Sequence, residues 1–321
     1  ILNNTPIYPK KSQNYLLALL IGFLFPLIIM FVRDLLNETI YTRSDVESIT
    51  DIPLLGIIGK NYTNFTLLSE INPKSIIAEG FRALRSNLSF SDESLEGNKT
   101  YLVTSSVASE GKTFVASNLA VLFANLGKKT IIVGTDLRKP KLWKNFLESN
   151  DLGISNYIEG DKKISEIISK TKIDNLDIVP SGPVPSNPAG LISNKSFDSF
   201  LHKLKEMYDI VVLDTPPVGL VADALTLMDY TNTTLYVVRQ GFTKRGLLAY
   251  IDELYKKERV KNVQIVLNDV KSGSGVYGYG SYAYGGYGYG YGYGYGYGYG
   301  YGYSSYGYGE SNKDSEYYDN S

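Results

Sequence analysis

The most hydrophobic part of the chain is an uncharged stretch, 15–32, with charged residues on both sides. Its length just reaches that of a membrane-spanning helix, in which Pro26 is tolerated. A buried core helix is the alternative, whereas a cleaved signal peptide is disfavoured because no small-residue cleavage site follows. We therefore expect a transmembrane helix over 15–32, preceded by an extracytoplasmic remnant, 1–14.

From about residue 72 the pattern alternates between two kinds of segment. Short, continuous apolar runs predict buried strands at 101–104, 130–133, 178–180, 210–213, 235–238 and 263–267. Apolar residues at helical spacing predict helices over 75–88, 114–126 and 197–207. Such alternation is typical of a mostly parallel sheet with helices on both faces, so the predicted fold class is α/β.

The same pattern divides the chain into regions. We expect one α/β domain over 73–272. Residues 33–72 are expected to form a juxtamembrane linker, in which the short apolar piece 52–58 docks on the domain. The last region, 273–321, has a different composition from everything before it.

That last region holds most of the tyrosine in the chain. Of 28 tyrosines, 17 lie between 277 and 318, most of them alternating with glycine from 287 to 303. Glycine at every second position offers no side chain to pack and loses much backbone entropy on ordering. We expect a largely disordered tail, for which self-association through aromatic stacking is an alternative role.

Composition also limits the chemistry. The chain has no Cys, which excludes thiol nucleophiles, disulfides, iron-sulfur clusters and Cys-containing zinc sites. A single histidine, His202, cannot build a multi-histidine metal site. The net charge of −1 gives no bulk attraction to nucleic acid, and no nucleic-acid partner is expected.

The most informative segment, 104–113, reads Thr-Ser-Ser-Val-Ala-Ser-Glu-Gly-Lys-Thr and lies between a predicted strand and a predicted helix. Gly111, Lys112 and Thr113 fit the end of a phosphate-binding loop, in which backbone N–H groups hold phosphate, the lysine reaches it and the hydroxyl takes Mg²⁺. The general pattern has glycine where this chain has Ser106. The order of strand, loop and helix still favours a phosphate loop.

Two further strands end in acidic residues. Asp214 follows the strand at 210–213, and Asp136 and Arg138 follow the strand at 130–133. Turn residues are the commoner fate of such aspartates, but open parallel sheets bind ligands at the carboxyl edge of their strands. An aspartate at this place commonly holds Mg²⁺ beside bound phosphates. The three segments together predict a nucleotide site.

These motifs carry a resemblance to a known family. The matching pieces are the loop 105–113, the segment 133–140, the Asp-Thr-Pro-Pro of 214–217, Ser-Gly-Pro from Ser181 with Asn187-Pro188, and Glu79-x-x-Arg82-x-x-Arg85. With a span before the domain and a tyrosine cluster after it, the chain resembles the bacterial tyrosine kinases (BY-kinases) attached to polysaccharide chain-length regulators. Their catalytic domain has the P-loop NTPase fold.

The resemblance implies a role for each matching residue. Lys112 binds and polarises the transferred phosphate, Thr113 ligates Mg²⁺, Asp214 holds the water shell of the ion, and Asp136 lies near the metal and the incoming hydroxyl. The implied catalytic set is Lys112, Asp136, Asp214 and Arg138. The implied metal set is Thr113, Asp136 and Asp214. The implied nucleotide-binding set is Ser106, Ser109, Glu110, Gly111, Lys112, Thr113 and Phe114.

The family also implies an assembly. The subunits would form a ring through a contact made by Glu79, Arg82 and Arg85, whose spacing places them on one helix face. In such a ring the tail of one subunit enters the site of its neighbour. The alternative is that these three residues form a solvated charged face. The implied phosphoacceptors are Tyr277, Tyr279, Tyr282, Tyr284, Tyr287, Tyr289, Tyr291, Tyr293, Tyr295, Tyr297, Tyr299, Tyr301, Tyr303, Tyr306, Tyr308, Tyr317 and Tyr318.

The chain departs from the family pattern in one important place. The family usually has an aspartate two residues before the position of Asp136, and this chain has Gly134. Either Asp136 acts as the base or no strong base is needed, since phosphoryl transfer depends mainly on positioning and charge neutralisation. Ala108 and Ser109 also replace the family's Pro and Gly.

Together with the nucleotide site predicted from the sequence, the resemblance implies a protein-tyrosine autokinase that uses ATP and Mg²⁺, acts in trans on tail tyrosines and regulates capsule or exopolysaccharide polymerisation and export. Expected partners are further copies of the chain, the membrane, the polysaccharide machinery and a tyrosine phosphatase. The expected location is the bacterial inner membrane, with the kinase domain and tail in the cytoplasm. The alternatives are a nucleotide-controlled membrane scaffold and a partitioning-type ATPase.

Overall fold

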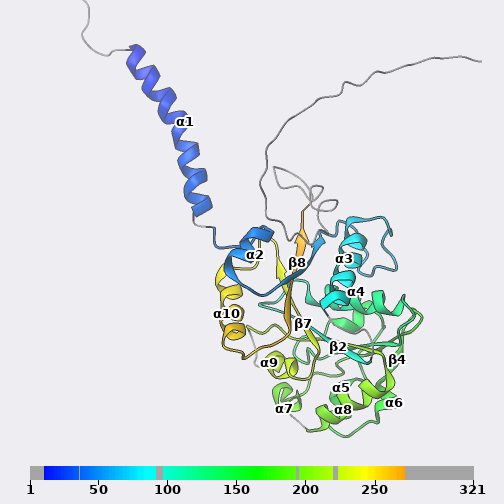
Figure 1. Ribbon diagram of the computed structural model, residues 1–321. Coiled ribbons are helices and arrows are strands. Elements are labelled where there is room, and N and C mark those ends of the chain that lie inside the picture. Colours follow the sequence, from blue (N-terminus) through cyan, green and yellow to red (C-terminus); the bar gives the residue numbers. More distant parts are fainter. Residues whose placement is uncertain (1–10, 36, 92–96, 193–194, 220–222, 272–321) are drawn as a thin grey trace, which may run out of the picture. The chain divides into compact units, whose positions relative to one another are not determined.

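The computed structural model describes residues 11–35, 37–91, 97–192, 195–219 and 223–271 (Figure 1). The predicted tail, 273–321, with all its candidate phosphoacceptors, lies outside the described residues, as do most residues of the predicted N-terminal remnant.

The uncharged stretch forms one long helix, α1 (Lys11–Leu35), with Pro26 inside it. Within it, residues Gln13–Arg33 are long and apolar enough to cross a membrane by length and composition. The large apolar side chains of this stretch are exposed, as expected of a helix whose surroundings are lipid. The predicted span, 15–32, lies within this helix.

The rest of the described chain is built on one twisted sheet, in the order β1-β8-β7-β2-β6-β3-β5-β4. Every neighbouring pair is parallel except β4 and β5. All six predicted strands are present. The strands are β1 (Leu54–Gly59), β2 (Lys99–Ser105), β3 (Thr130–Gly134), β4 (Ser169–Lys170), β5 (Leu176–Val179), β6 (Ile210–Asp214), β7 (Thr233–Arg239) and β8 (Val263–Val270).

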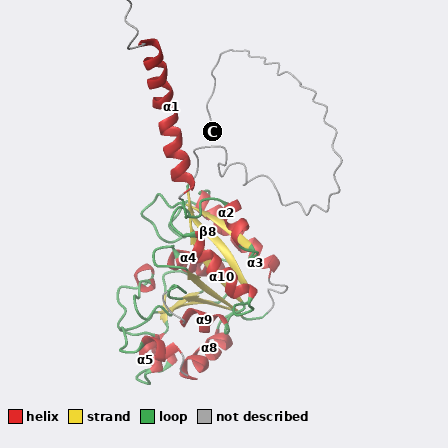
Figure 2. Cartoon of the chain, turned by 90° about the vertical axis from the view of Figure 1, so that its left-hand side faces the viewer, coloured by secondary structure: helices red, strands yellow, loops and turns green. Residues whose placement is uncertain are grey.

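Helices cover both faces of this sheet, as Figures 1 and 2 show, and confirm the predicted α/β architecture. On one face lie α3 (Ile76–Ser91), α4 (Lys112–Ala124) and the 3₁₀ turn η1 (Leu142–Asn145). On the other lie α2 (Arg43–Ile49), α5 (Ile154–Ile158), α6 (Ile164–Ile167), α7 (Pro188–Ile192), α8 (Lys195–Met207), α9 (Asp223–Met228) and α10 (Arg245–Lys256).

The strands have no polar face because both sides are covered. Along β6, Val211 and Leu213 pack into one hydrophobic core, and Ile210 and Val212 pack into the core on the opposite face. Successive side chains of a strand point to opposite faces, so a strand between two helical layers needs apolar residues at every position. This explains the continuous apolar runs in the sequence.

The segment 37–72, expected to be a linker, contributes to the sheet. Strand β1 pairs in parallel with β8, and Ile52 and Ile58 are buried. Helix α2 is tied to α10 where the hydroxyl of Thr50 donates a 2.8 Å hydrogen bond to Asp252. The docking expected of 52–58 is thus strand pairing. Two glycines among the six residues of β1 weaken its strand signal in the sequence.

This arrangement predicts that β1 is part of the stable fold. Replacing Ile58 by Ala should lower the free energy of unfolding by about 2–5 kcal/mol, because it removes buried methyl groups and leaves a cavity. Tyr62→Ala is the control, since Tyr62 lies three residues past β1 and is exposed. Urea unfolding followed by circular dichroism measures both; equal stability of the two variants would mean that β1 only rests on the domain.

Candidate functional site

The loop that joins β2 to α4 lies at the carboxyl edge of the sheet, where the sequence predicts a phosphate site. Gly111 ends the loop with φ 98° and ψ 16°, a left-handed conformation that favours glycine. A Cβ atom there would also collide with the side-chain amide of Asn268. Lys112 and Thr113 then form the first turn of α4, whose N-terminal N–H groups are suited to an anion.

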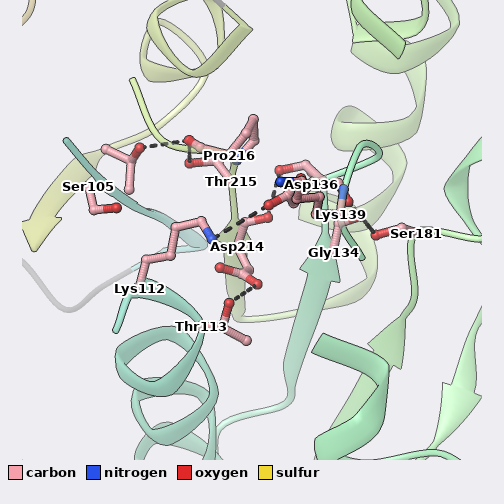
Figure 3. Close-up of polar contacts among 12 residues, drawn as sticks. Ser105, Lys112, Thr113, Gly134, Asp136, Lys139, Ser181, Asp214, Thr215 and Pro216 are labelled. Atoms are coloured by element: carbon pink, nitrogen blue, oxygen red, sulfur yellow. Dashed lines mark hydrogen bonds and ion pairs between the residues drawn. The ribbon is translucent and has the colours of Figure 1, made fainter. Parts of the chain in front are cut away.

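The order of the strands brings the two predicted aspartates to this loop. Strand β6 lies between β2 and β3, with Asp214 level with Val103 on one side and Gly134 on the other. Asp136 follows β3 two residues later. Figure 3 shows Lys112 and Thr113 of α4 facing Asp136 and Asp214 respectively.

Lys112 is paired with Asp136. Its Nζ lies 3.5 Å from Oδ2 of Asp136, and only 13% and 11% of the two side chains are exposed. The other oxygen, Oδ1, accepts a hydrogen bond of 3.1 Å from the N–H of Lys139, which fixes the turn after β3. The predicted lysine and the predicted acid therefore lie together beside the phosphate loop.

Asp214 is a deeply buried acid at the site. Its Oδ2 accepts a 2.9 Å hydrogen bond from the hydroxyl of Thr113, and its buried Oδ1 has no hydrogen-bond partner among the described residues. Burial raises the pKa of Asp214 to about 6; the positive charge of Lys112 and the Thr113 hydrogen bond oppose this rise, and the charge of Asp136 adds to it. An unpartnered, buried carboxylate oxygen is a suitable ligand for a cation or for a water bound to it.

The donor set fits Mg²⁺ better than a metal held by protein alone. Among the described residues, no group of three or more His, Cys, Asp or Glu side chains could hold an ion. Mg²⁺ commonly binds one or two carboxylates and completes its shell with water and substrate phosphates. The hydroxyl of Thr113 with Asp214 and Asp136 is a set of that kind, so the predicted metal residues lie together.

Gly134 is closely packed against Ser181. A Cβ atom on Gly134 would lie 2.9 Å from Oγ of Ser181 and 3.3 Å from its backbone nitrogen. The hydroxyl of Ser181 donates a 2.8 Å hydrogen bond to the carbonyl of Gly134. The space beside residue 134 is therefore occupied, and Asp136 is the acid that this strand supplies.

Other predicted nucleotide-binding residues have different surroundings. The hydroxyl of Ser106 is buried against that of Tyr236 at 2.8 Å, and the carboxylate of Glu110 is buried too. These two side chains therefore support the loop from the protein interior. Ser109 is exposed at the loop tip with φ 71°, and Phe114 packs edge-on against Phe81 of α3.

The sequence pattern did not single out one side of the site. An open pocket of about 160 Å³ lies beside the loop, lined in part by Ser109, Phe114, Arg239 and Asn268. Arg239 donates to the carbonyl of Ser109 at 2.8 Å and pairs with Asp269 at 2.8 Å. A polar Asn-Asp pair near the end of β8, after the apolar run 265–267, is the signal that could have found it.

The predicted subunit-contact residues lie on α3, outside the loop region. Glu79 is exposed and pairs with Arg82, which also donates to the carbonyl of Pro73. Arg85 is partly exposed on the same helix. Arg138 is exposed two residues past Asp136. The first three residues therefore lie on one helix, and Arg138 lies near the site; their roles are proposals.

Comparisons with known proteins agree on one family. A family model described as an AAA domain matches residues 107–265. The tyrosine-protein kinase CpsD of Streptococcus agalactiae serotype III is 34% identical over 201 residues, which are 62% of this chain and 85% of that protein. The crystal structure of the chimerical protein CapA2B2 is 35% identical with a TM-score of 0.66, covering 72% of this chain and 100% of that one.

A longer relative extends the match to most of the chain. The tyrosine-protein kinase ptk of Acinetobacter johnsonii is 29% identical over 285 residues, 85% of this chain. This chain spans only 39% of the length of that relative. The match therefore concerns one part of a longer protein in that case and nearly a whole protein in the case of CpsD.

The burial of Asp214 should lower the free energy of unfolding at neutral pH while favouring the binding of Mg²⁺-nucleotide. Since its folded-state pKa lies above the ordinary 3.8, the stability that its protonation contributes is present below about pH 4 and lost as pH rises through about 6. At pH 7.5 and without ligand, Asp214→Asn should therefore raise the free energy of unfolding by on the order of 2 kcal/mol, while Mg²⁺-nucleotide no longer raises the melting temperature. In the unsubstituted protein, Mg²⁺-nucleotide affinity should fall as pH drops below about 6, because ligating carboxylates must be ionised.

Asp209→Asn is the matched control, since Asp209 flanks the opposite end of β6 and is exposed. Differential scanning fluorimetry with and without Mg²⁺-ADP, from pH 5 to 8, measures both effects. Nucleotide protection that survives in Asp214→Asn would contradict the assignment.

Proposed function

The chain belongs to the bacterial tyrosine kinase (BY-kinase) family, and from this premise we propose that it is a protein-tyrosine autokinase. It transfers the γ-phosphate of ATP, with Mg²⁺, to tyrosines in the C-terminal region of a neighbouring copy. The observation that carries the proposal is the convergence of Lys112, Thr113, Asp136 and Asp214 at one edge of the sheet, where one oxygen of Asp214 has no hydrogen-bond partner in the described part of the chain.

Each residue of this group has a defined task. The N–H groups of the loop and the first turn of α4 bind phosphate, and Lys112 binds the transferred group. Thr113 and Asp214 hold Mg²⁺, which when bound neutralises charge on the phosphates. Asp214 must be ionised to do so, and its pKa of about 6 leaves it largely ionised at neutral pH.

Asp136 is the acid closest to the expected path of the incoming hydroxyl. Residue 134 is Gly in this chain, so β3 supplies no second carboxylate at that position. A loose transition state needs positioning and charge neutralisation more than a strong base. Asp136 orients Lys112 and the tyrosine hydroxyl, and Arg138, exposed beside it, adds positive charge for the phosphate.

The composition of 273–321 supplies the substrate. Glycine lies on both sides of most of its tyrosines, so their flanks carry little steric bulk and many can enter one cleft. Phosphorylation of such a segment adds about −1.5 to −2 charges per tyrosine. The proposed acceptors are the 17 tyrosines from Tyr277 to Tyr318 given above.

The proposed setting is a membrane-bound ring. Helix α1 anchors the chain in the bacterial inner membrane, and Glu79, Arg82 and Arg85 of α3 form the contact between subunits, exchanging the internal Glu79–Arg82 pair for pairs across the interface. In this setting the kinase regulates polymerisation and export of capsule or exopolysaccharide, with the export machinery and a tyrosine phosphatase as partners.

Transfer of labelled phosphate tests the activity. With γ-labelled ATP and Mg²⁺, the chain should acquire phosphotyrosine, and Lys112→Met should lower the rate by at least about 10³-fold, because the charge that stabilises the transferred group is lost. Lys128→Met, on an exposed lysine after the other end of α4, is the control. Phosphate release without labelled tyrosine would instead favour a partitioning-type ATPase, and nucleotide binding with neither product a scaffold.

Transfer between copies is tested by separating the enzyme from its acceptor. A chain that lacks 273–321 should phosphorylate the full-length Lys112→Met chain, with a rate that rises with the concentration of either. Replacing Glu79, Arg82 and Arg85 together by Ala in both chains should lower this rate by about tenfold or more. Labelling only of a chain that has its own active site would show transfer in cis.

A further inference from the structure

Glu110 is a buried acid inside the phosphate loop that the proposed transfer does not use. It lies one residue before Gly111, and its side chain is fully buried. Both carboxylate oxygens are engaged: Oε2 accepts the N–H of Val107 at 2.7 Å, and Oε1 accepts the hydroxyl of Thr243. A carboxylate so enclosed has no access to an incoming hydroxyl, which excludes a role as general base.

The backbone of Glu110 is fixed as well. Its carbonyl accepts a 3.0 Å hydrogen bond from the side-chain amide of Asn268 on β8. The same amide lies where a side chain on Gly111 would be. Contacts from strand β8 and from Thr243, which lies after β7, therefore fix Glu110, which lies two residues before Lys112.

Thr243 belongs to a turn that holds the loop at a second point. This turn, 239–243, follows β7. The oxygen of the Thr243 hydroxyl accepts the N–H of Arg239 at 2.8 Å, so its proton is directed to Glu110. The guanidinium of Arg239 donates to the carbonyl of Ser109 at 2.8 Å. The turn thus binds adjacent residues of the loop, Ser109 and Glu110.

We propose that Glu110 is a positioning residue whose carboxylate fastens the phosphate loop to the turn 239–243 through Thr243 and so pre-organises the loop for nucleotide. The inference rests on the proposed function, because it concerns the same site. The carboxylate joins Val107 and Thr243, which are far apart in sequence, and closes the loop before any ligand arrives. Without this link, ordering of the loop is a cost of binding.

The pair Thr243→Val and Thr243→Ser tests the link. Valine keeps the shape of threonine and lacks the hydroxyl, whereas serine keeps the hydroxyl. Hydrogen bonds to charged groups are strong, so Thr243→Val should weaken Mg²⁺-ADP binding by about tenfold or more. Thr243→Ser should remain within about threefold of the unsubstituted chain. Fluorescent-nucleotide titration of the full chain in detergent measures the Kd.

Two further measurements separate positioning from general stability. In steady-state kinetics, Thr243→Val should raise KM for ATP with a smaller change in kcat, since the loop adopts its working form once nucleotide is bound.

The second measurement compares single and double variants. Glu110→Gln, which cannot accept both hydrogen bonds, should weaken Mg²⁺-ADP binding by a factor similar to that of Thr243→Val. The double variant should be little worse than either single one, because both remove the same contact. Thr231→Val is the control, since the hydroxyl of Thr231 contacts the carbonyl of Met228 and the hydroxyl of Thr234, both within three residues of it.

The inference is overturned if Thr243→Val binds Mg²⁺-ADP as tightly as the unsubstituted chain, if Thr243→Ser is as weak as Thr243→Val, or if the losses from Glu110→Gln and Thr243→Val add in full. Should Thr243→Val not fold, Glu110→Gln alone carries the test, with a Kd and KM equal to those of the unsubstituted chain counting against it. Failure of the proposed function is separate, because it shows as absent phosphotyrosine in the unsubstituted chain, whatever the nucleotide affinity.

Discussion

The buried carboxylate of Asp214 is the constraint on which the site depends. It lies at the end of the strand between β2 and β3, so the loop after β2 and the acid after β3 both face it. Burial disfavours its charge, and the Thr113 hydroxyl and the Lys112 ammonium compensate only in part. A charge held in this way strongly favours a cation at the unpartnered oxygen. The buried carboxylate therefore creates an electrostatic demand for a cation, which the proposed Mg²⁺-nucleotide would satisfy.

The strand order makes this arrangement possible and also packs the strand ends closely against one another. Gly134 pairs with Asp214 across β3 and β6, and the carbonyl of Asp214 accepts both the N–H and the hydroxyl of Thr135. Ser181 closes the other side of Gly134. A Cβ atom on Gly134 would therefore need Ser181 to shift. Strand β3 supplies one acid to the site, Asp136, held by Lys112 and the N–H of Lys139, and β6 supplies Asp214.

Much of this was accessible from the sequence. Continuous apolar runs predicted six strands because a sheet covered on both faces requires them, and Gly111, Lys112 and Thr113 located the loop. Asp136 and Asp214 were found because acids after parallel strands meet at one edge. Strand β1 was missed as a strand because its two glycines interrupt the signal. The inward direction of Glu110 depends on Thr243, which is 133 residues later in the sequence, and no local pattern reports such a contact.

The turn that holds the loop also connects it to the segment that follows the apolar helix. The carbonyl of Thr243 accepts the N–H of Ile40 at 2.9 Å, and the N–H of Gly241 donates to the carbonyl of Ile40 at 2.7 Å. Residues 38–41 begin a few positions after α1, so a short backbone pairing joins that segment to the turn. On the other side, β8 carries Asn268 against the loop and pairs with β1. The loop is thus braced by elements at both sequence ends of the described domain. Residues 37–59, through the Ile40 pairing and strand β1, are part of that support, and a flexible linker in their place would leave Thr243 without its contact to Ile40.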